Sequence, residues 1–376
     1  VNDYGELIKS IEKTKNLAKK AFGNSDVFLE KFIKNARHIE IQVFGFGEIG
    51  AVHFYERDCS IQRRFQKIIE ESPAPKVETD IINEMAERAV NFASNEKYEG
   101  AGTIEFIYDL DEKKFYFLEM NTRIQVEHPV TEAITNTDLV AMQIKFALDL
   151  DLDIKEQKEI TKSGHALECR LYAEDPSKNF LPSPGKILKL RTPNTEYKNI
   201  RLDIGIDEGD EISFYYDPMI AKIISKGTDR NESIINMINY LKDFEIEGIN
   251  TNKSFLISLL QDKNFREANF NTKFIENNLD SIVSKKEDLF NKKQNIKETK
   301  QEYSDKDVKA FEKIIAKTPK IKNDQGYTAK DIKAFDNIVS SNNKKSKTEI
   351  KTEVKNVTGK IYDTPKFLPA GDKYML

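Results

Sequence analysis

The sequence predicts an α+β protein in which folded parts are followed by a lysine-rich tail. Along residues 1–280, short runs rich in β-branched and aromatic residues, typical of strands, are interspersed with apolar residues at helical spacing. After residue 280, lysine, asparagine, serine and glutamate dominate, which is typical of a flexible linker. A length of 376 residues suggests two or three domains, and we place them at 1–150, 151–280 and 281–376.

Each expected element follows from its local pattern. Helical spacing predicts helices at 3–21, 79–95, 138–148 and 231–244, and one that ends at 260. Strand-forming runs predict strands at 27–33, 39–46, 49–55, 102–108, 115–121, 165–172, 212–216 and 219–225. Residues 57–67 contain three arginines and a lysine, and on charge alone they indicate a solvated basic loop. Two similar segments, 307–312 and 331–336, predict short helices within the tail.

Composition narrows the functional class. The formal net charge of −4 gives no reason to expect a nucleic-acid partner. No stretch approaches the ~18–20 apolar residues of a membrane span, so we expect no membrane partner. Two cysteines, Cys59 and Cys169, fit a reducing compartment, and by default both are small buried residues. We expect a cytoplasmic location. Because the chain opens at Val1, a segment targeting it to the mitochondrial matrix or a plastid could precede it.

The hairpin at 102–121 places acidic side chains together. If Glu105 faces Glu119, the pairing continues to Tyr108 with Tyr116. Alternation puts Glu119 and Asn121 on one face, with Phe115 and Phe117 before them. Two opposed carboxylates destabilise a sheet unless something compensates. Oxygen ligands suit Mg²⁺ or Mn²⁺, so Glu105, Glu119 and Asn121 are candidate metal ligands.

Polar side chains continue the alternation beyond the hairpin. If the backbone stays extended to Pro129, Arg123, Gln125 and Glu127 line one side. The alternative is an ordinary exposed polar face of a two-stranded edge. Near the other hairpin, His38, Glu40 and Gln42 share a face opposite Ile39, Ile41 and Val43.

Three motifs resemble the signatures of biotin carboxylases, which are ATP-grasp enzymes. They are Glu119 to Glu132, then Glu56 to Lys67 with Glu70 to Pro75, and Gly164 to Arg170 with Ala173 to Pro176 and Phe180 to Gly185. The resemblance covers roughly residues 1–280. It implies a partial ATP-grasp domain at 1–150 and a biotin carboxylase C-terminal domain at 151–280. The implied reaction is carboxylation of biotin by bicarbonate and ATP through carboxyphosphate, the first half-reaction of a carboxylase that we expect to act on an acyl-CoA.

The resemblance also assigns roles to single residues. Glu30, Lys31, Phe32 and Ile33 match the hinge that contacts adenine, and His38 matches a nucleotide contact; a simple strand histidine is the alternative. Phe65 stands where the family usually has a nucleotide-binding histidine. A phenylalanine cannot donate a hydrogen bond to the nucleotide, but it can stack on the sugar or base. Lys67 and Arg123 would hold bicarbonate, which the Val126 backbone would also contact. Gln125 is a further candidate binding residue, and Glu127 is the candidate general base. Arg170 matches the arginine that stabilises the biotin enolate, although an ion pair with Glu168 or a neighbour would also explain it.

Implied cofactors and partners follow from the same resemblance. They are ATP, two Mg²⁺ or Mn²⁺ ions, bicarbonate, a biotin carboxyl carrier protein or domain, a carboxyltransferase and further copies of the chain. The final acceptor stays open between acetyl-, propionyl- or methylcrotonyl-CoA, pyruvate and urea, because the carboxyltransferase selects it. The sequence contains no Ala-Met-Lys-Met biotinylation motif and no glycine-rich phosphate loop. We therefore expect this chain alone to bind ATP weakly and not to turn over. The alternatives are a non-catalytic assembly module and another ATP-grasp ligase, such as a carbamoyl-phosphate synthase.

Overall fold

A computed structural model describes residues 3–152, 154, 156–193 and 197–283 of the chain. The helices are α1 (Tyr4–Phe22), α2 (Thr79–Asn95), α3 (His128–Thr135), α4 (Leu139–Ala147), α5 (Arg230–Asp243), α6 (Lys253–Leu260) and α7 (Lys263–Arg266). The longer strands are β1 (Ala36–Phe46), β2 (Ala51–Arg63), β3 (Gln66–Ser72), β4 (Glu99–Asp109), β5 (Lys114–Asn121), β6 (His165–Tyr172), β11 (Ile200–Ile204) and β13 (Met219–Gly227). Short strands are β7 (Glu174–Asp175), β8 (Leu181–Pro182), β9 (Gly185–Lys186), β10 (Lys189–Arg191), β12 (Glu211–Ile212) and β14 (Glu245–Glu247). The expected helices of the tail lie outside the described residues.

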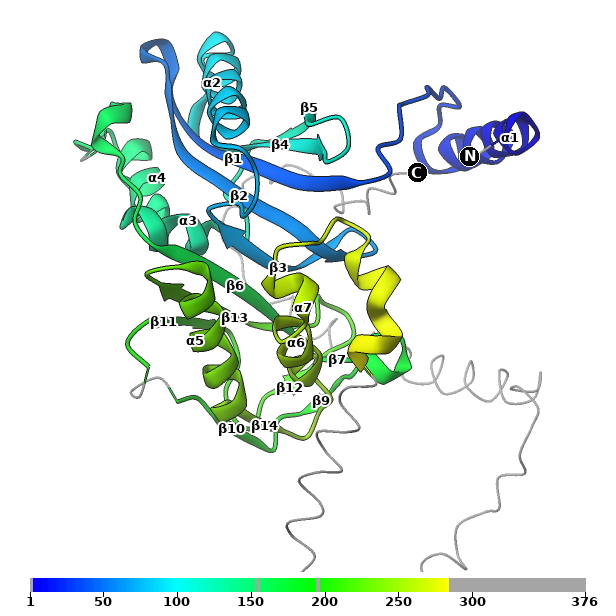
Figure 1. Ribbon diagram of the computed structural model, residues 1–376, viewed down its shortest axis with the longest axis vertical. Helices are drawn as coiled ribbons and strands as arrows, with labels where there is room; N and C mark the ends of the chain where they lie inside the picture. The colour runs from blue at the N-terminus through cyan, green and yellow to red at the C-terminus, as the bar shows by residue number, and fades with distance from the viewer. Residues whose placement is uncertain (1–2, 153, 155, 194–196, 284–376) are drawn as a thin grey trace, which may run out of the picture. The chain divides into compact units, whose positions relative to one another are not determined.

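One eight-stranded sheet connects the two expected folded domains (Figure 1). Its strand order is β11-β13-β6-β3-β2-β1-β4-β5, and its pairings are antiparallel. The sheet includes strands from both sides of residue 150, where the sequence suggests a domain boundary. β3 pairs with β6, and Ile69 lies opposite Cys169. Side chains from both halves of the sequence can therefore meet on one face of the sheet.

Apolar and polar side chains alternate along β1 as the sequence predicts. Ile39, Ile41 and Val43 are buried in one cluster with Met85 and Ala89 of α2, which covers this face. The intervening residues of β1 point to the opposite face, and although polar they are also buried. A polar interior of this kind requires partners for each side chain, because unpaired buried polar groups are costly.

Helices cover both faces of the sheet at β6 and β13. On one face, Leu167 and Cys169 pack into a large cluster with residues of α5 and α6. On the other face, Val130 and Ile134 of α3 pack against Ala166 and Ile224. The α3 helix thereby brings the segment that precedes it against the polar face of the sheet.

Capping residues explain where several helices begin and end. Asp3 accepts a hydrogen bond from the Glu6 amide at 2.9 Å, and Gly23 ends α1 in the left-handed region at φ 74°. Asp138 accepts from the Ala141 amide at 2.7 Å and caps the start of α4. Ile144 is 56% exposed because α4 buries only one side. None of the helices in the described part of the chain is long and apolar enough to cross a membrane.

Three expectations about where strands and loops lie are wrong. Residues 24–33 form no strand, because this segment pairs with no other described strand, and Phe28, Leu29 and Phe32 are exposed. The expected basic loop at 57–67 is instead the hairpin of β2 and β3, with Arg57 fully buried. The strand expected at 212–216 is reduced to the end of β12, since residues 213–217 form no ladder.

The β4–β5 hairpin has the predicted central register. Glu105 lies opposite Glu119, but Phe106 then pairs with Phe117, which leaves Leu118 as the extra residue of a bulge. Tyr108 consequently pairs with Phe115 and not with Tyr116. The bulge also reverses the side-chain direction, so Phe115 packs in the α2 cluster and does not share the face of Glu119.

Candidate active site

Lys67 on β3 lies among three carboxylates from three different segments. Its ammonium is 2.8 Å from Glu40 Oε2, 3.1 Å from Glu105 Oε1 and 2.6 Å from Glu127 Oε1. We call these four residues the Lys67 cluster. Burial works against the charge of Lys67, but Cys59 and the carboxylates outweigh it and hold the pKa of Lys67 well above its usual value. The site is therefore built around a cation that stays charged.

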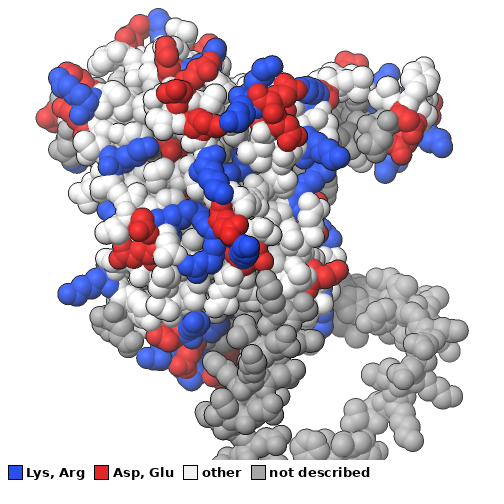
Figure 2. Space-filling view, in the orientation of Figure 1, with Lys and Arg blue, Asp and Glu red and all other residues white. Residues whose placement is uncertain are grey.

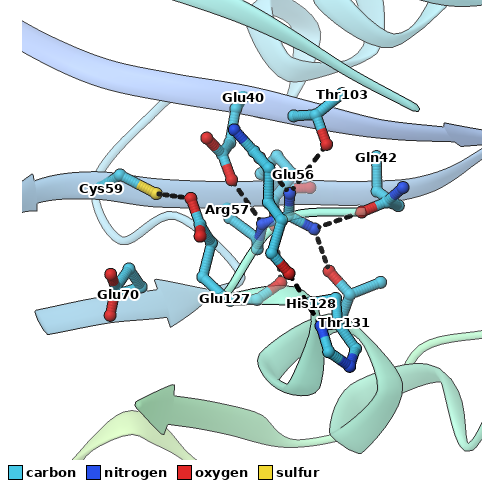
Figure 3. Close-up of polar contacts among 12 residues, drawn as sticks. Glu40, Gln42, Glu56, Arg57, Cys59, Glu70, Thr103, Glu127, His128 and Thr131 are labelled. Atoms are coloured by element: carbon cyan, nitrogen blue, oxygen red, sulfur yellow. Dashed lines mark hydrogen bonds and ion pairs between the residues drawn. The ribbon is translucent and has the colours of Figure 1, made fainter. Parts of the chain in front are cut away.

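Arg57 on β2 connects the polar side chains behind this cluster (Figure 3). It is fully buried, and all three guanidinium nitrogens donate hydrogen bonds. The acceptors are Glu40 Oε1 (2.5 Å), Gln42 Oε1 (2.8 Å), Thr131 Oγ1 (3.0 Å), Thr103 Oγ1 (3.2 Å) and Gln125 Oε1 (3.0 Å). Because these acceptors come from β1, α3, β4 and the segment before α3, Arg57 fixes their relative positions.

Glu40 is held ionised between two cations. Burial alone would raise its pKa, but Arg57 and Lys67 lower the pKa of Glu40 to about 2. The same balance applies to Glu127: burial and Glu40 would raise its pKa, whereas Lys67 and Arg170 hold the pKa of Glu127 below its usual value. Both carboxylates can therefore accept protons or hydrogen bonds at neutral pH.

Arg170 on β6 reaches the cluster from the second half of the chain. Its Nε donates to Glu70 Oε1 at 2.6 Å and its Nη2 to Glu127 Oε2 at 2.9 Å. Of the alternatives for an ion pair, Glu168 or a neighbour, Glu168 makes no hydrogen bond to Arg170, and the neighbour that pairs with it is Glu70. Glu127 thus accepts from Lys67 through one oxygen and from Arg170 through the other.

The three expected metal ligands lie together on the β4–β5 hairpin. The Asn121 amide nitrogen is 3.0 Å from Glu105 Oε1 and 3.2 Å from Glu119 Oε1, so both carboxylates point toward one side chain. Rotation of this amide would present its oxygen to the same position. Two carboxylates and an amide oxygen fit the preference of Mg²⁺ and Mn²⁺ for hard oxygen ligands.

Neighbouring polar groups orient the Glu105 carboxylate. His38 Nε2 is 2.9 Å from Glu105 Oε2, and Gln125 Nε2 donates to Glu105 Oε1 at 2.6 Å. Burial would raise the pKa of Glu105, but His38, Lys67 and Gln125 lower it. The carboxylate is thus ionised and held in place before any ligand binds.

The backbone from 122 to 127 is not extended, contrary to the sequence expectation. Pro129 lies in the first turn of α3, where proline is well tolerated, so the chain bends before it. The bend directs Gln125 and Glu127 into the interior, whereas Arg123 stays exposed, 3.5 Å from Asn121 Oδ1. Lys222 of β13 fixes the bend by donating to the Val126 carbonyl at 2.9 Å.

Other predicted residues lie outside the cluster. Phe65 is at the tip of the β2–β3 hairpin and is 79% exposed. Glu30, Lys31, Phe32 and Ile33 belong to the segment without secondary structure. Contacts of this segment are with other surface groups: Lys31 pairs with Glu112 at 2.7 Å, and Lys273 lies over the Phe32 ring.

Sequence reasoning missed several residues of the site. The alternation along β1 is the available signal for Glu40, but it only places Glu40 among three polar residues on one face. Arg57, Glu70 and Lys222 were not predicted, because a buried charged residue has no local pattern that distinguishes it from a surface one. Figure 2 illustrates the difficulty: on the face shown, Lys and Arg lie interspersed with Asp and Glu.

Two family models match the chain. Residues 1–155 match the carbamoyl-phosphate synthase L chain, ATP binding domain, and residues 168–277 match the biotin carboxylase C-terminal domain. Together they include every residue of the Lys67 cluster and Arg170.

Curated relatives are similar over most of the described residues. Biotin carboxylase 1 of Bacillus subtilis (strain 168) is 49% identical over 271 residues, which are 72% of this chain and 60% of that protein. The mitochondrial methylcrotonoyl-CoA carboxylase subunit alpha of Mus musculus is 44% identical over 275 residues, 73% of this chain and 38% of that protein. The chain therefore spans three fifths or less of the length of these relatives.

Solved structures show the same fold. The biotin carboxylase domain dimer of Hydrogenobacter thermophilus 2-oxoglutarate carboxylase, in complex with MgADP, ADP and bicarbonate, has a TM-score of 0.69 and 41% identity, covering 73% of this chain and 60% of that one. Biotin carboxylase from Campylobacter jejuni, in a β,γ-ATP complex, has a TM-score of 0.69 and 40% identity with the same coverage.

Proposed function

Because this chain belongs to the biotin carboxylase family of ATP-grasp proteins, as its three motifs predicted, we propose that it carries the reaction centre of an ATP-dependent biotin carboxylase. The proposed reaction joins bicarbonate to biotin through carboxyphosphate, with ATP cleaved to ADP and phosphate. The observation that carries the proposal is the Lys67 cluster: one partly buried ammonium among three ionised carboxylates, with Arg170 2.9 Å from one of them.

The reaction must bring together two anions, ATP and bicarbonate. In the proposal Glu105, Glu119 and Asn121 hold Mg²⁺ or Mn²⁺, which screens the phosphates when bound. The hydrogen bond from Gln125 and the close contact with His38 keep the Glu105 carboxylate aimed at that position. His38, Phe65 and the segment Glu30 to Ile33 are the proposed nucleotide contacts. The MgADP and ADP of the Hydrogenobacter domain support this assignment.

Bicarbonate is proposed to bind beside Lys67. Lys67 and Arg123 supply positive charge, and the planar guanidinium of Arg123 matches a planar oxyanion. Gln125 and the Val126 backbone complete the binding site, with Lys222 fixing the Val126 carbonyl. The exposed position of Arg123 lets bicarbonate enter from solvent before the guanidinium closes on it.

Glu127 is the proposed general base. Its ionised carboxylate takes the proton of bicarbonate. An oxygen of the resulting carbonate bonds to the γ-phosphorus of ATP, and the bond from that phosphorus to the β,γ-bridging oxygen breaks to release ADP. Carboxyphosphate then separates into CO₂ and phosphate. The phosphate removes the N1 proton of biotin, and Arg170 stabilises the resulting enolate, which attacks CO₂.

The expected partners follow from the family. They are a biotin carboxyl carrier protein or domain, a carboxyltransferase and a second copy of the chain. The similarity to methylcrotonoyl-CoA carboxylase subunits supports an acyl-CoA as final acceptor, and the Hydrogenobacter domain is a dimer.

The decisive experiment measures ATP cleavage by the full gene product with and without free biotin and bicarbonate. We expect cleavage to require both, and Glu127→Gln to reduce it by about 10²–10⁴-fold. Glu48→Gln is the matched control, because the Glu48 side chain is 79% exposed and pairs only with Lys97 in the described structure. Wild-type turnover by Glu127→Gln, or ammonia replacing biotin as the second requirement, would contradict the proposal.

A further inference from the structure

Two buried glutamates face each other next to Arg170. Glu70 on β3 lies directly opposite Glu168 on β6, and both have 0% exposure. Directly opposed residues of an antiparallel pair project from the same face, with Cβ atoms about 4.5–5.5 Å apart. The two carboxyl groups are therefore close neighbours in the interior of the protein.

Their hydrogen bonding is incomplete. Glu70 Oε1 accepts from Arg170 Nε at 2.6 Å, but among the described residues Glu70 Oε2 has no hydrogen-bond partner, and neither oxygen of Glu168 has one. Buried carboxylates without partners are strongly unfavourable and normally become protonated. Three oxygens on the two opposed carboxyl groups are therefore unpaired. This is the arrangement expected of two carboxyl groups that share a proton.

Nearby cations are already engaged elsewhere. The charged groups that face the pair are Lys67 of β3, Arg170 of β6, Lys222 of β13 and Glu127 before α3. Lys222 donates to the Val126 carbonyl and lies 3.4 Å from Asp203, and Arg170 contacts Glu70 and Glu127. None of these cations makes a hydrogen bond to Glu168, so a proton is the remaining compensation.

The pKa shifts agree with this geometry. Burial and the charge of Glu70 raise the pKa of Glu168 well above its usual value. Burial also raises the pKa of Glu70, to about 7, against the opposing effect of Arg170. In a coupled pair of this kind the proton belongs to both groups, and Glu168, which lacks a cationic partner, holds it for most of the time.

We propose that Glu70 and Glu168 share one proton at neutral pH and together act as a positioning pair for Arg170. Glu70 keeps the charge that anchors Arg170 Nε, while protonated Glu168 prevents a second buried charge beside it. Loss of the proton would draw the Arg170 guanidinium toward the carboxylates of Glu70 and Glu168. The guanidinium would thereby move away from Glu127, which accepts a hydrogen bond from its Nη2. The role of Arg170 in catalysis rests on the proposed function, whereas the sharing of the proton does not.

Infrared spectroscopy of the 376-residue chain tests the shared proton directly. We expect a carbonyl stretch of a protonated buried carboxyl group at neutral pH, which disappears in Glu168→Gln and persists in Glu48→Gln. Circular dichroism establishes that each variant is folded. The absence of this band in the folded wild type, or its persistence in folded Glu168→Gln, would overturn the proposal. The test needs no turnover, so it remains valid if the proposed carboxylation fails.

The positioning role is tested by the pH profile of the full gene product. We expect the biotin-dependent rate to fall at alkaline pH in the wild type, and this fall to be absent in Glu168→Gln, which cannot ionise at that position. Glu70→Gln should lower kcat by about 10–100-fold through loss of a charge-assisted hydrogen bond to Arg170, with little change in KM for ATP. An unchanged alkaline limb in Glu168→Gln, or an unchanged kcat in Glu70→Gln, would refute the positioning role.

Discussion

Replacing Arg57 with methionine should expose the energetic role of the buried network. Methionine matches much of the length of arginine but donates no hydrogen bond. The variant would leave Glu40, which is fully buried, without its 2.5 Å partner, and four neutral oxygens would lose a donor. The nearest remaining cation to this buried carboxylate would then be Lys67, at 2.8 Å.

The size of the effect follows from these contacts. Removing one partner of a buried ion pair costs about 3–5 kcal/mol, mostly because the remaining charge is uncompensated. Replacing both partners by apolar residues is often close to neutral. We therefore expect Arg57→Met to lower the free energy of unfolding by about 3–5 kcal/mol, and the double variant with Glu40→Met to lose less than the single one.

Urea denaturation of the 376-residue chain measures both values. Arg88→Met is the matched control, because the Arg88 side chain is 65% exposed and pairs with Glu84 along α2; we expect a change within about 0.5 kcal/mol. A loss below about 1 kcal/mol in Arg57→Met would refute the reasoning. So would a double variant whose loss equals the sum of the two single losses, because independent sites add and coupled ones do not.

Three further predictions concern the hairpin tip, the acid stability and the metal ligands. Phe65 lies at φ 67° in a two-residue turn, so Phe65→Gly should raise the free energy of unfolding by about 1 kcal/mol. The same variant should weaken nucleotide binding in a titration, and tighter binding would contradict the stacking role. Burial would raise the pKa of Glu71, but Arg230 and His165 hold it at about 2, so stability should be full above pH 4.5 and fall as the pH drops toward 2. Arg230→Gln should flatten this dependence in pH-dependent denaturation, and an unchanged slope would contradict it. Glu119→Gln should weaken Mn²⁺ binding by about tenfold or more in a calorimetric titration, whereas equal affinity would exclude Glu119 as a ligand.

Strands were predictable where the alternation of side chains is clear and the pairing strand is close in the sequence. The alternation of β1 and the opposition of Glu105 and Glu119 follow from side-chain period and hairpin pairing. The bulge at Leu118 was not predictable, because an extra residue leaves the composition of a strand unchanged. The segment 27–33 has strand-forming residues but no partner among the described strands, and the sequence pattern alone does not reveal that difference.

The site was less predictable than the fold. Lys67 and Arg170 were identified only through their motifs, since each belongs to a charged or strand-like stretch with an ordinary explanation. The inward turn of Gln125 and Glu127 depends on Pro129 starting a helix, although the residue before a proline usually favours an extended chain. Arg57 and Glu168 became visible only when burial and partners were known, because a charged residue in a strand does not indicate its own exposure.

The proposed reaction transfers the γ-phosphoryl group of ATP to bicarbonate at the Lys67 cluster. The most direct measurement supplies bicarbonate labelled with heavy oxygen to the full gene product and analyses the released phosphate by mass spectrometry. If carboxyphosphate forms at the Lys67 cluster, one bicarbonate oxygen should appear in the phosphate, and its yield should fall with Glu127→Gln. Phosphate whose new oxygen comes only from water would contradict the account.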